Sequence, residues 1–181
     1  MNWPSCVLLL SAVLLAGCDA AGGSAATTVS PNSPASPQQV VANATVTYVV
    51  DGDTVDLAID TDDGVVEERV RLIGIDTPET KRPDTPVECF GPEATAFVEQ
   101  LLPVGTDVRV ERDVVGRDDF GRLLGYLYLA DDGTFVNEMI VRRGFATPLS
   151  IEPNTTFARV MVEAARAAES EDLGLWARCG G

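Results

Sequence analysis

The sequence predicts an α+β protein, mainly β, in which five short strands form a small barrel and three helices pack against it. From residue 44 onward, strand-like segments with alternating apolar residues are separated by turn signals. Segments with a helical apolar period lie after or between them. Hydrophobic residues make up 45% of the 181 residues, which is enough to bury a core.

Turn signals divide the strand-like segments. Asp51-Gly52-Asp53 separates the first two strands, and residues 60–64 (DTDDG) form a hairpin turn before the third. We therefore expect the first three strands to be antiparallel neighbours. The predicted strands cover residues 45–50, 54–59, 65–75, 106–112 and 123–129.

Three helices are predicted from apolar residues that share one face. Pro92 suits the first turn of the first helix, and Gly144 ends the second. Residues 76–90 contain three prolines and should form a long loop, which in a compact domain is usually functional or disordered. The predicted helices cover residues 91–102, 137–143 and 155–169.

Composition excludes several kinds of chemistry. Histidine is absent, so Ser-His catalysis, histidine-bridged nuclease sites and His-ligated zinc are excluded. The net charge of −15 argues against broad electrostatic adhesion to a polyanion. A nucleic-acid substrate would need a locally basic site, and hydrolysis would have to use carboxylates, arginines and a hard metal ion.

The N-terminus predicts export. The apolar run of residues 7–16 is shorter than the ~20 residues that span a bilayer. It leads into Leu15-Ala16-Gly17-Cys18, which resembles the lipobox of bacterial lipoproteins. This resemblance implies a signal peptide over residues 1–17, lipidation of Cys18 and anchoring to a bacterial membrane on the extracytoplasmic side. Because no Lys or Arg precedes the run, an ordinary secretory signal or a misassigned start is the alternative.

Two further boundaries follow from composition. Residues 18–43 are rich in Ala, Ser and Pro and read as a flexible linker after Cys18. Residues 44–181 then form the folded domain.

After removal of Cys6 and lipidation of Cys18, Cys89 and Cys179 remain as an even pair in an exported protein. A disulfide between them is therefore expected, with two unpaired thiols as the alternative.

An unusual set of charges surrounds residues 71–79 (RLIGIDTPE), where core packing requires none. The carboxylates of Asp53 and Asp76, with the backbone carbonyl of Thr77, suit a hard cation such as Ca²⁺. Glu79 is placed to accept a proton from an attacking water. Taken singly, these motifs have an ordinary alternative as turns and strand ends with solvated charges.

Two arginines complete this candidate site. Arg71 and Arg122 offer guanidinium groups that match phosphate oxygens and stabilise a transition state with extra negative charge. A straight strand would separate Arg71 from Asp76 by about 16 Å, so we expect a bend at Gly74. With that bend, Arg71, Asp76 and Glu79 should converge with Asp53 and Arg122 on one pocket.

Five motifs, in order, resemble the thermonuclease family, also called staphylococcal nuclease-like, over about residues 45 to 177. The resemblance implies a five-stranded OB-fold Greek-key barrel. It also implies a calcium-dependent phosphodiesterase that acts on DNA and RNA, with Glu79 as the general base. The motifs are residues 50–55 (VDGDTV), 71–80 (RLIGIDTPET), 91–94 (GPEA), 120–122 (FGR) and 136–138 (VNE), the last followed by 141–142 (VR).

Substrate handling departs from the family pattern. Two aspartates precede Phe120, and residues 149–151 (LSI) stand where tyrosines are often found. Phe120, Lys81 and Arg82 are the candidate substrate contacts, although the two basic residues are as readily a solvated pair. We therefore expect weak, salt-sensitive binding by a monomeric nuclease. The alternative is a catalytically weak OB-fold module that binds nucleic acid or protein.

Overall fold

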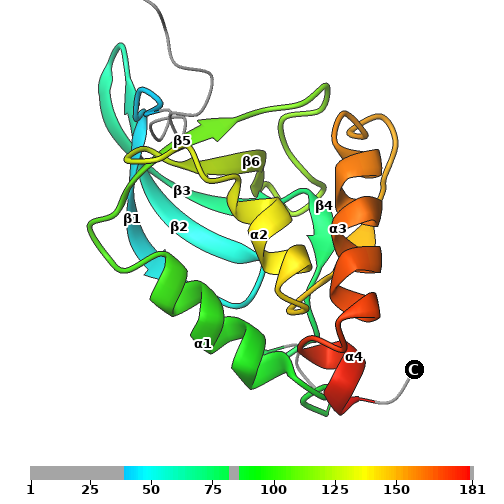
Figure 1. The fold of residues 1–181 in the computed structure, drawn as a ribbon. Coiled ribbons are helices and arrows are strands. Elements are labelled where there is room, and N and C mark those ends of the chain that lie inside the picture. Colours follow the sequence, from blue (N-terminus) through cyan, green and yellow to red (C-terminus); the bar gives the residue numbers. More distant parts are fainter. Residues whose placement is uncertain (1–38, 82–85, 180–181) are drawn as a thin grey trace, which may run out of the picture. The chain divides into compact units, whose positions relative to one another are not determined.

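Five strands close into a barrel in the order β1-β2-β3-β6-β5 (Figure 1). The first three are consecutive antiparallel neighbours, as the turn signals predicted. β5 pairs antiparallel with β1 and β6, and a parallel pairing of β3 with β6 closes the barrel. This arrangement confirms the expected OB-fold barrel. The strands are β1 (Ala44–Val49), β2 (Thr54–Thr61), β3 (Gly64–Leu72), β5 (Asp107–Glu111) and β6 (Leu123–Leu129).

This computed structural model describes residues 39–81 and 86–179. The predicted signal peptide, Cys18, most of the linker and Arg82 lie outside the described residues. Within the described ranges, none of the helices has the length and hydrophobicity needed to cross a membrane.

The helices lie on the outside of the barrel (Figure 1). The three predicted helices are α1 (Gly91–Leu101), α2 (Val136–Arg142) and α3 (Ala158–Ser170). A fourth, short helix, α4 (Leu175–Arg178), was not predicted. α4 begins where Gly174 packs backbone to backbone against Gly144, and the N–H of Leu175 donates to the Gly144 carbonyl at 2.8 Å. This contact joins residues far apart in the sequence, so local propensity does not show it.

The strand predicted over residues 65–75 is interrupted. β3 ends at Leu72, and Gly74 adopts a positive φ of 84° that favours glycine. The chain then continues as β4 (Gly74–Asp76), which leaves the barrel and pairs with β7 (Thr147–Leu149) in a separate two-stranded sheet. The bend expected at Gly74 is therefore present, and it redirects Asp76 away from the line of β3.

A buried amide ties α2 to this bend. Asn137 is fully buried, and its Nδ2 donates to the Ile73 carbonyl at 2.9 Å. Its Oδ1 accepts the N–H of Leu127 at 2.9 Å, inside β6. One side chain thus fixes the position of the bend relative to the barrel. The surrounding core includes Leu57, Leu72, Leu127, Ile140 and Met161, all fully buried.

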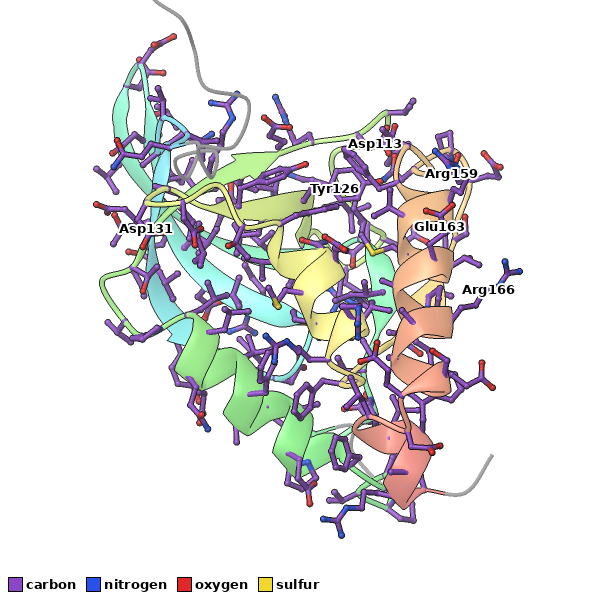
Figure 2. All side chains as sticks on the ribbon, viewed as in Figure 1. Asp113, Tyr126, Asp131, Arg159, Glu163 and Arg166 are labelled. Carbon is purple, nitrogen blue, oxygen red and sulfur yellow. A yellow bond between two sulfur atoms is a disulfide. The ribbon has the colours of Figure 1, made fainter. Side chains whose placement is uncertain are left out.

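A second set of polar contacts joins β6 to the residues that precede α3. The hydroxyl of Tyr126 on β6 donates to Asp113 at 2.8 Å, and Figure 2 shows both residues. The ring of Tyr126 packs edge-on against Phe157. Asp113 also accepts the hydroxyl of Thr156 at 3.0 Å. Burial opposes ionisation of Asp113, but these hydrogen bonds outweigh it and lower the pKa of the carboxyl. Burial, and then the Asp113 carboxylate, raise the pKa of Tyr126, which keeps the phenol a donor.

Candidate active site

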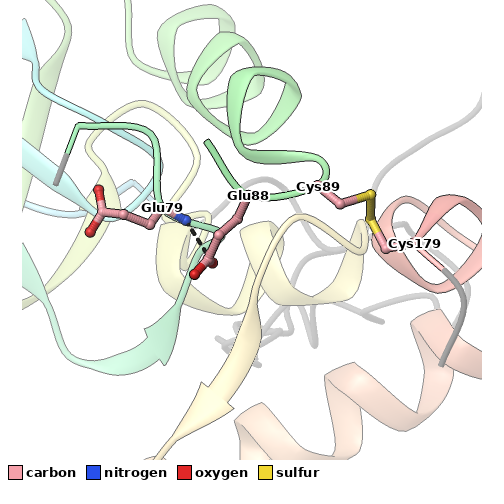
Figure 3. The surroundings of a disulfide bond; sticks show 4 residues. All are labelled: Glu79, Glu88, Cys89 and Cys179. Carbon is pink, nitrogen blue, oxygen red and sulfur yellow. Dashed lines mark hydrogen bonds between the residues drawn. A yellow bond between two sulfur atoms is a disulfide. The ribbon is translucent and has the colours of Figure 1, made fainter. Parts of the chain in front are cut away.

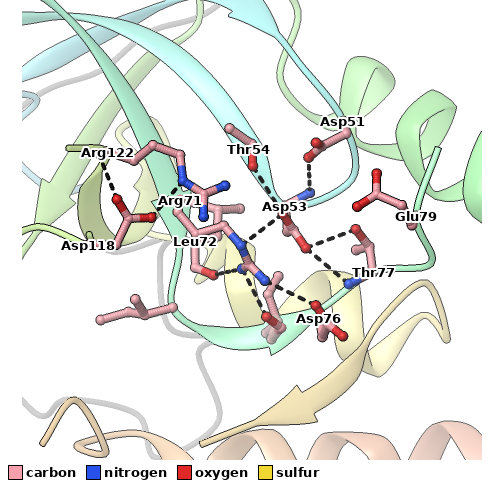
Figure 4. Close-up of polar contacts among 12 residues, drawn as sticks. Asp51, Asp53, Thr54, Arg71, Leu72, Asp76, Thr77, Glu79, Asp118 and Arg122 are labelled. Carbon is pink, nitrogen blue, oxygen red and sulfur yellow. Dashed lines mark hydrogen bonds and ion pairs between the residues drawn. The ribbon is translucent and has the colours of Figure 1, made fainter. Parts of the chain in front are cut away.

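One small cavity collects the charged residues that the sequence singled out. Its volume is about 250 Å³. Asp53, Arg71, Asp76, Glu79 and Arg122, which were expected to converge, all line it (Figure 4). The complete lining is Asp51, Asp53, Arg71, Asp76, Thr77, Pro78, Glu79, Glu88 and Arg122.

Asp53 is fixed by the turn between β1 and β2. Oδ2 accepts the backbone N–H and the hydroxyl of Thr77 at 3.1 and 3.0 Å. Gly52 allows this approach, because a Cβ there would lie 2.8 Å from the Thr77 Oγ1. The neighbouring Asp51 accepts the Asp53 N–H at 3.1 Å. Burial, and then the charge of Asp53, raise the pKa of Asp51.

Arg71 spans the bend between β3 and β4. Its side chain is only 14% exposed, and its Nε lies 3.1 Å from Asp53 Oδ1. Nη1 donates to the carbonyls of Leu72 and Ile75, and Nη2 donates to Asp76 Oδ1 at 3.2 Å. A guanidinium has five N–H groups. Among the described residues, three of them have hydrogen-bond acceptors, and the Nε–H lies in the ion pair with Asp53, so at least one N–H remains for a ligand.

Arg122 offers more free donors than Arg71. Its Nε donates to Asp118 Oδ2 at 2.7 Å, and the other oxygen of Asp118 accepts the N–H groups of Phe120 and Arg122. In the described part of the chain, neither Nη group of Arg122 has a hydrogen-bond acceptor. Burial opposes the ionisation of Asp118, but its bonds to Arg122 outweigh this and lower its pKa. Asp118 therefore holds the guanidinium while both Nη groups remain available.

Glu79 lies on the loop after β4. Its Oε1 accepts the N–H groups of Thr80 and Lys81 at 3.0 and 2.9 Å. Its own N–H donates to the Glu88 carboxylate at 3.0 Å. Local hydrogen bonds and a partner nine residues away thus orient this segment at the cavity wall.

The two described candidates for substrate contact, Lys81 and Phe120, lie outside this cavity. The Nζ of Lys81 donates to the Val50 carbonyl and lies 5.6 Å from the centre of the Tyr48 ring. Phe120 is 85% exposed, and its ring centre is 5.7 Å from the Arg122 guanidinium. It lines an adjoining cavity of about 510 Å³ that also contacts Arg71 and Arg122.

Two residues of the site were not assigned a role from sequence. Asp118 stood out only as an acidic departure from the family pattern. Its spacing of four residues from Arg122 was a signal that could have indicated the ion pair between them. Glu88 showed no signal, because its contact with Glu79 depends on the tertiary position of the residues that lead into α1.

The cavity suits a hard cation by its chemistry. Of the described residues, five with carboxylate side chains line it, and none with a sulfur or imidazole does. Across residues 39–81 and 86–179, no three Asp, Glu, Cys or His side chains form a ready-made metal cage. An ion here would therefore have few protein ligands and keep several waters, which hard cations tolerate.

Comparisons with known proteins identify the family of this chain. A family model described as Staphylococcal nuclease homologue matches residues 69–178. The chain is 37% identical over 133 residues to the thermonuclease of Staphylococcus intermedius, covering 74% of this chain and 75% of that protein. It is 34% identical over 131 residues to the thermonuclease of Staphylococcus hyicus, covering 72% and 73%. It is also 36% identical over 140 residues to the SPbeta prophage-derived endonuclease YokF of Bacillus subtilis strain 168, covering 76% of this chain and 45% of that protein. The chain therefore belongs to the staphylococcal nuclease homologue family and is an endonuclease.

Proposed function

We propose that this endonuclease is a calcium-dependent phosphodiesterase that hydrolyses DNA or RNA at the cell surface. The observation that carries the proposal is a single cavity in which carboxylates face two arginines, one with both Nη groups available. Carboxylates suit a hard cation, and guanidinium groups suit phosphate oxygens. A binding module would need no carboxylate in the position of Glu79.

Asp53, Asp76 and Thr77 are the residues that would hold the calcium ion. A bound calcium ion would supply Lewis-acid stabilisation of a phosphate oxygen and help to organise the attacking water. The Asp53 carboxylate is already oriented by Thr77 and Arg71, so it would need little reorganisation.

Glu79 would act as the general base. It accepts a proton from water while the water oxygen forms a bond to phosphorus, and the P–O ester bond breaks with its electron pair remaining on the leaving oxygen, which takes a proton from solvent. The two Nη groups of Arg122 stabilise the negative charge that develops on the phosphate oxygens. Arg71 contributes its remaining N–H and keeps Asp53 and Asp76 in place.

Binding of substrate would be weak and sensitive to salt. The guanidinium of Arg122 is shared with Asp118, and Lys81 is engaged with Val50 and Tyr48. The net charge is −15. Hydrolysis should slow as salt rises, because the contacts between arginine and phosphate are ionic and salt weakens them. A rate unchanged between low salt and several hundred millimolar would contradict this expectation.

The decisive experiment is digestion of single-stranded DNA by the full chain with Ca²⁺, with EGTA, and with Glu79→Gln in Ca²⁺. We expect strong loss of activity in the last two conditions. Glu99→Gln, on the exposed face of α1, is the matched control and should keep full activity. Equal hydrolysis in all three conditions would refute the proposed mechanism.

The cell-surface location is a separate part of the proposal. It rests on the lipobox-like Leu15-Ala16-Gly17-Cys18, which would place a lipid on Cys18. Detergent phase partitioning of the protein expressed in bacteria tests it. The wild-type chain should enter the detergent phase and Cys18→Ala the aqueous phase; the same partition for both would argue against the anchor. The anchored nuclease is expected to be a monomer.

A further inference from the structure

Glu88 holds the backbone of Glu79 from across the loop (Figure 3). Its Oε2 accepts the Glu79 N–H at 3.0 Å, and its own N–H donates to the Glu79 carbonyl at 2.9 Å. The two bonds run in opposite directions, so together they fix both the distance and the orientation of the Glu79 backbone. Glu88 also lines the active-site cavity.

The three residues after Glu88 are each anchored to a different part of the fold. Cys89 forms a disulfide with Cys179 at the end of α4, with the two Cα atoms 5.8 Å apart. The Phe90 ring stacks on Phe145 with centroids 5.3 Å apart. Gly91, at the start of α1, packs closely against the backbone of Pro78, because a Cβ on Gly91 would lie 3.0 Å from the Pro78 carbonyl oxygen. Glu88 is therefore next to a covalent anchor that ties the loop to the C-terminal helix.

This attachment matters because Glu79 lies outside the helices and strands. Its Oε1 accepts the N–H groups of the next two residues, so the carboxylate moves with its own stretch of backbone. Catalytic groups lose efficiency steeply with misplacement, and an error of about 1 Å can cost roughly a hundredfold in rate.

We infer that Glu88 is a positioning residue for Glu79, and that the Cys89–Cys179 disulfide acts on the reaction by holding Glu88 in place. The inference rests on the proposed general-base role of Glu79. It assigns the disulfide a part in the rate of hydrolysis in addition to its part in stability.

Substitutions at Glu88 separate positioning from general stability. Glu88→Ala removes the acceptor for the Glu79 N–H, whereas Glu88→Gln keeps an acceptor oxygen. With the full chain, Ca²⁺ and single-stranded DNA, we expect Glu88→Ala to lower kcat about tenfold with KM unchanged. Glu88→Gln should restore most of this loss, and Glu99→Ala, a matched change on α1, should have no effect.

The disulfide is tested by combining variants. Cys89→Ser/Cys179→Ser should lower kcat by a similar factor at a temperature where it stays folded. In the Glu88→Ala background the same pair should lower kcat no further, because the hydrogen bond to Glu79 is already absent. Full additivity, or a folded Cys pair variant with wild-type kcat, would overturn the role of the disulfide. If that pair fails to fold, the single variants Glu88→Ala and Glu88→Gln decide whether Glu88 positions Glu79.

A readout without catalysis distinguishes this inference from the proposed function. The amide proton resonance of Glu79, followed by NMR, reports its bond to the Glu88 carboxylate. It should shift in Glu88→Ala and in the Cys pair variant but not in Glu99→Ala. If the wild-type chain fails to hydrolyse DNA but the resonance shifts, the proposed function fails and the positioning contact stands. If the wild-type chain is active but the Glu79 amide resonance does not shift in Glu88→Ala, the positioning contact is refuted instead.

Discussion

Replacing Arg71 by lysine tests whether this residue holds the bend that forms the active site. Arg71 reaches two carboxylates and two carbonyls on both sides of the bend. A lysine ammonium is a single point on a flexible stem, so it can satisfy only one or two of these acceptors. The others would remain partly buried without a donor.

The expected cost follows from the hydrogen bonds that a lysine cannot make. Two or three hydrogen bonds to a charged donor, at the lower value of about 1.5 kcal/mol each, give a loss of roughly 3 to 4.5 kcal/mol in the free energy of unfolding. The proposed catalytic role predicts in addition a loss of about a hundredfold in kcat. Because Asp53 and Asp76 lose a common partner, calcium binding should weaken as well.

Urea unfolding without calcium, followed by tryptophan fluorescence, measures the structural part. Arg159→Lys is the matched control, because the Arg159 side chain is 85% exposed and pairs with Glu163 on the surface of α3 (Figure 2). That change should alter the free energy of unfolding by less than about 0.5 kcal/mol. If Arg71→Lys cost no more than this control, the claim that Arg71 holds the bend would be refuted.

Three further predictions concern stability. Asn137→Leu should lower the free energy of unfolding by about 3 kcal/mol in urea titrations, because it leaves a buried N–H and a buried carbonyl without partners; a loss under about 1 kcal/mol would show that the amide link is unimportant. Cys89→Ser/Cys179→Ser opens a loop of 90 residues and should cost about 4 to 5 kcal/mol in the chain-entropy model, and an unchanged urea midpoint would exclude that estimate. Because the pKa of Asp113 is lowered in the folded state, the Asp113 carboxylate stabilises the fold at pH values above its ordinary pKa of 3.8. This contribution is lost as the pH falls through the folded-state pKa. Asp113→Asn should therefore flatten the fall of stability below about pH 4 in urea titrations from pH 2.5 to 6; an equally steep fall in the variant would contradict the assignment.

Local patterns predicted the strands and three of the helices well. Leu123–Leu129 forms β6 with the expected bounds, and the glycine bend at Gly74 is where the sequence placed it. These features depend on alternation, turn residues and backbone freedom, which act over a few residues. By contrast, α4 and the pairing of β4 with β7 depend on contacts between distant segments, and no local pattern indicated either.

The site residues also fall into those that local sequence indicated and those that depend on contacts between distant segments. Carboxylates and arginines stood out because core packing does not need them, and five of those predicted line the cavity. Lys81 and Phe120 lie outside it, because the lysine bonds a backbone carbonyl and the phenylalanine lines the adjoining cavity. Glu88 and Asp118 were overlooked as site residues because their importance comes from the partners they hold.

The sequence alone determined the chemistry available to this protein. Without histidine, its candidate site groups are carboxylates and guanidinium groups, and its motifs placed it in a nuclease family. Only the tertiary structure decided how these groups are shared. Closure of the barrel by β3 and β6 brings Arg122 beside Arg71, and the bend at Gly74 returns Asp76 to the same cavity. Each arginine then has its own set of hydrogen-bond acceptors within reach. The distances to these acceptors decide which N–H groups stay free, and short-range sequence patterns do not contain those distances.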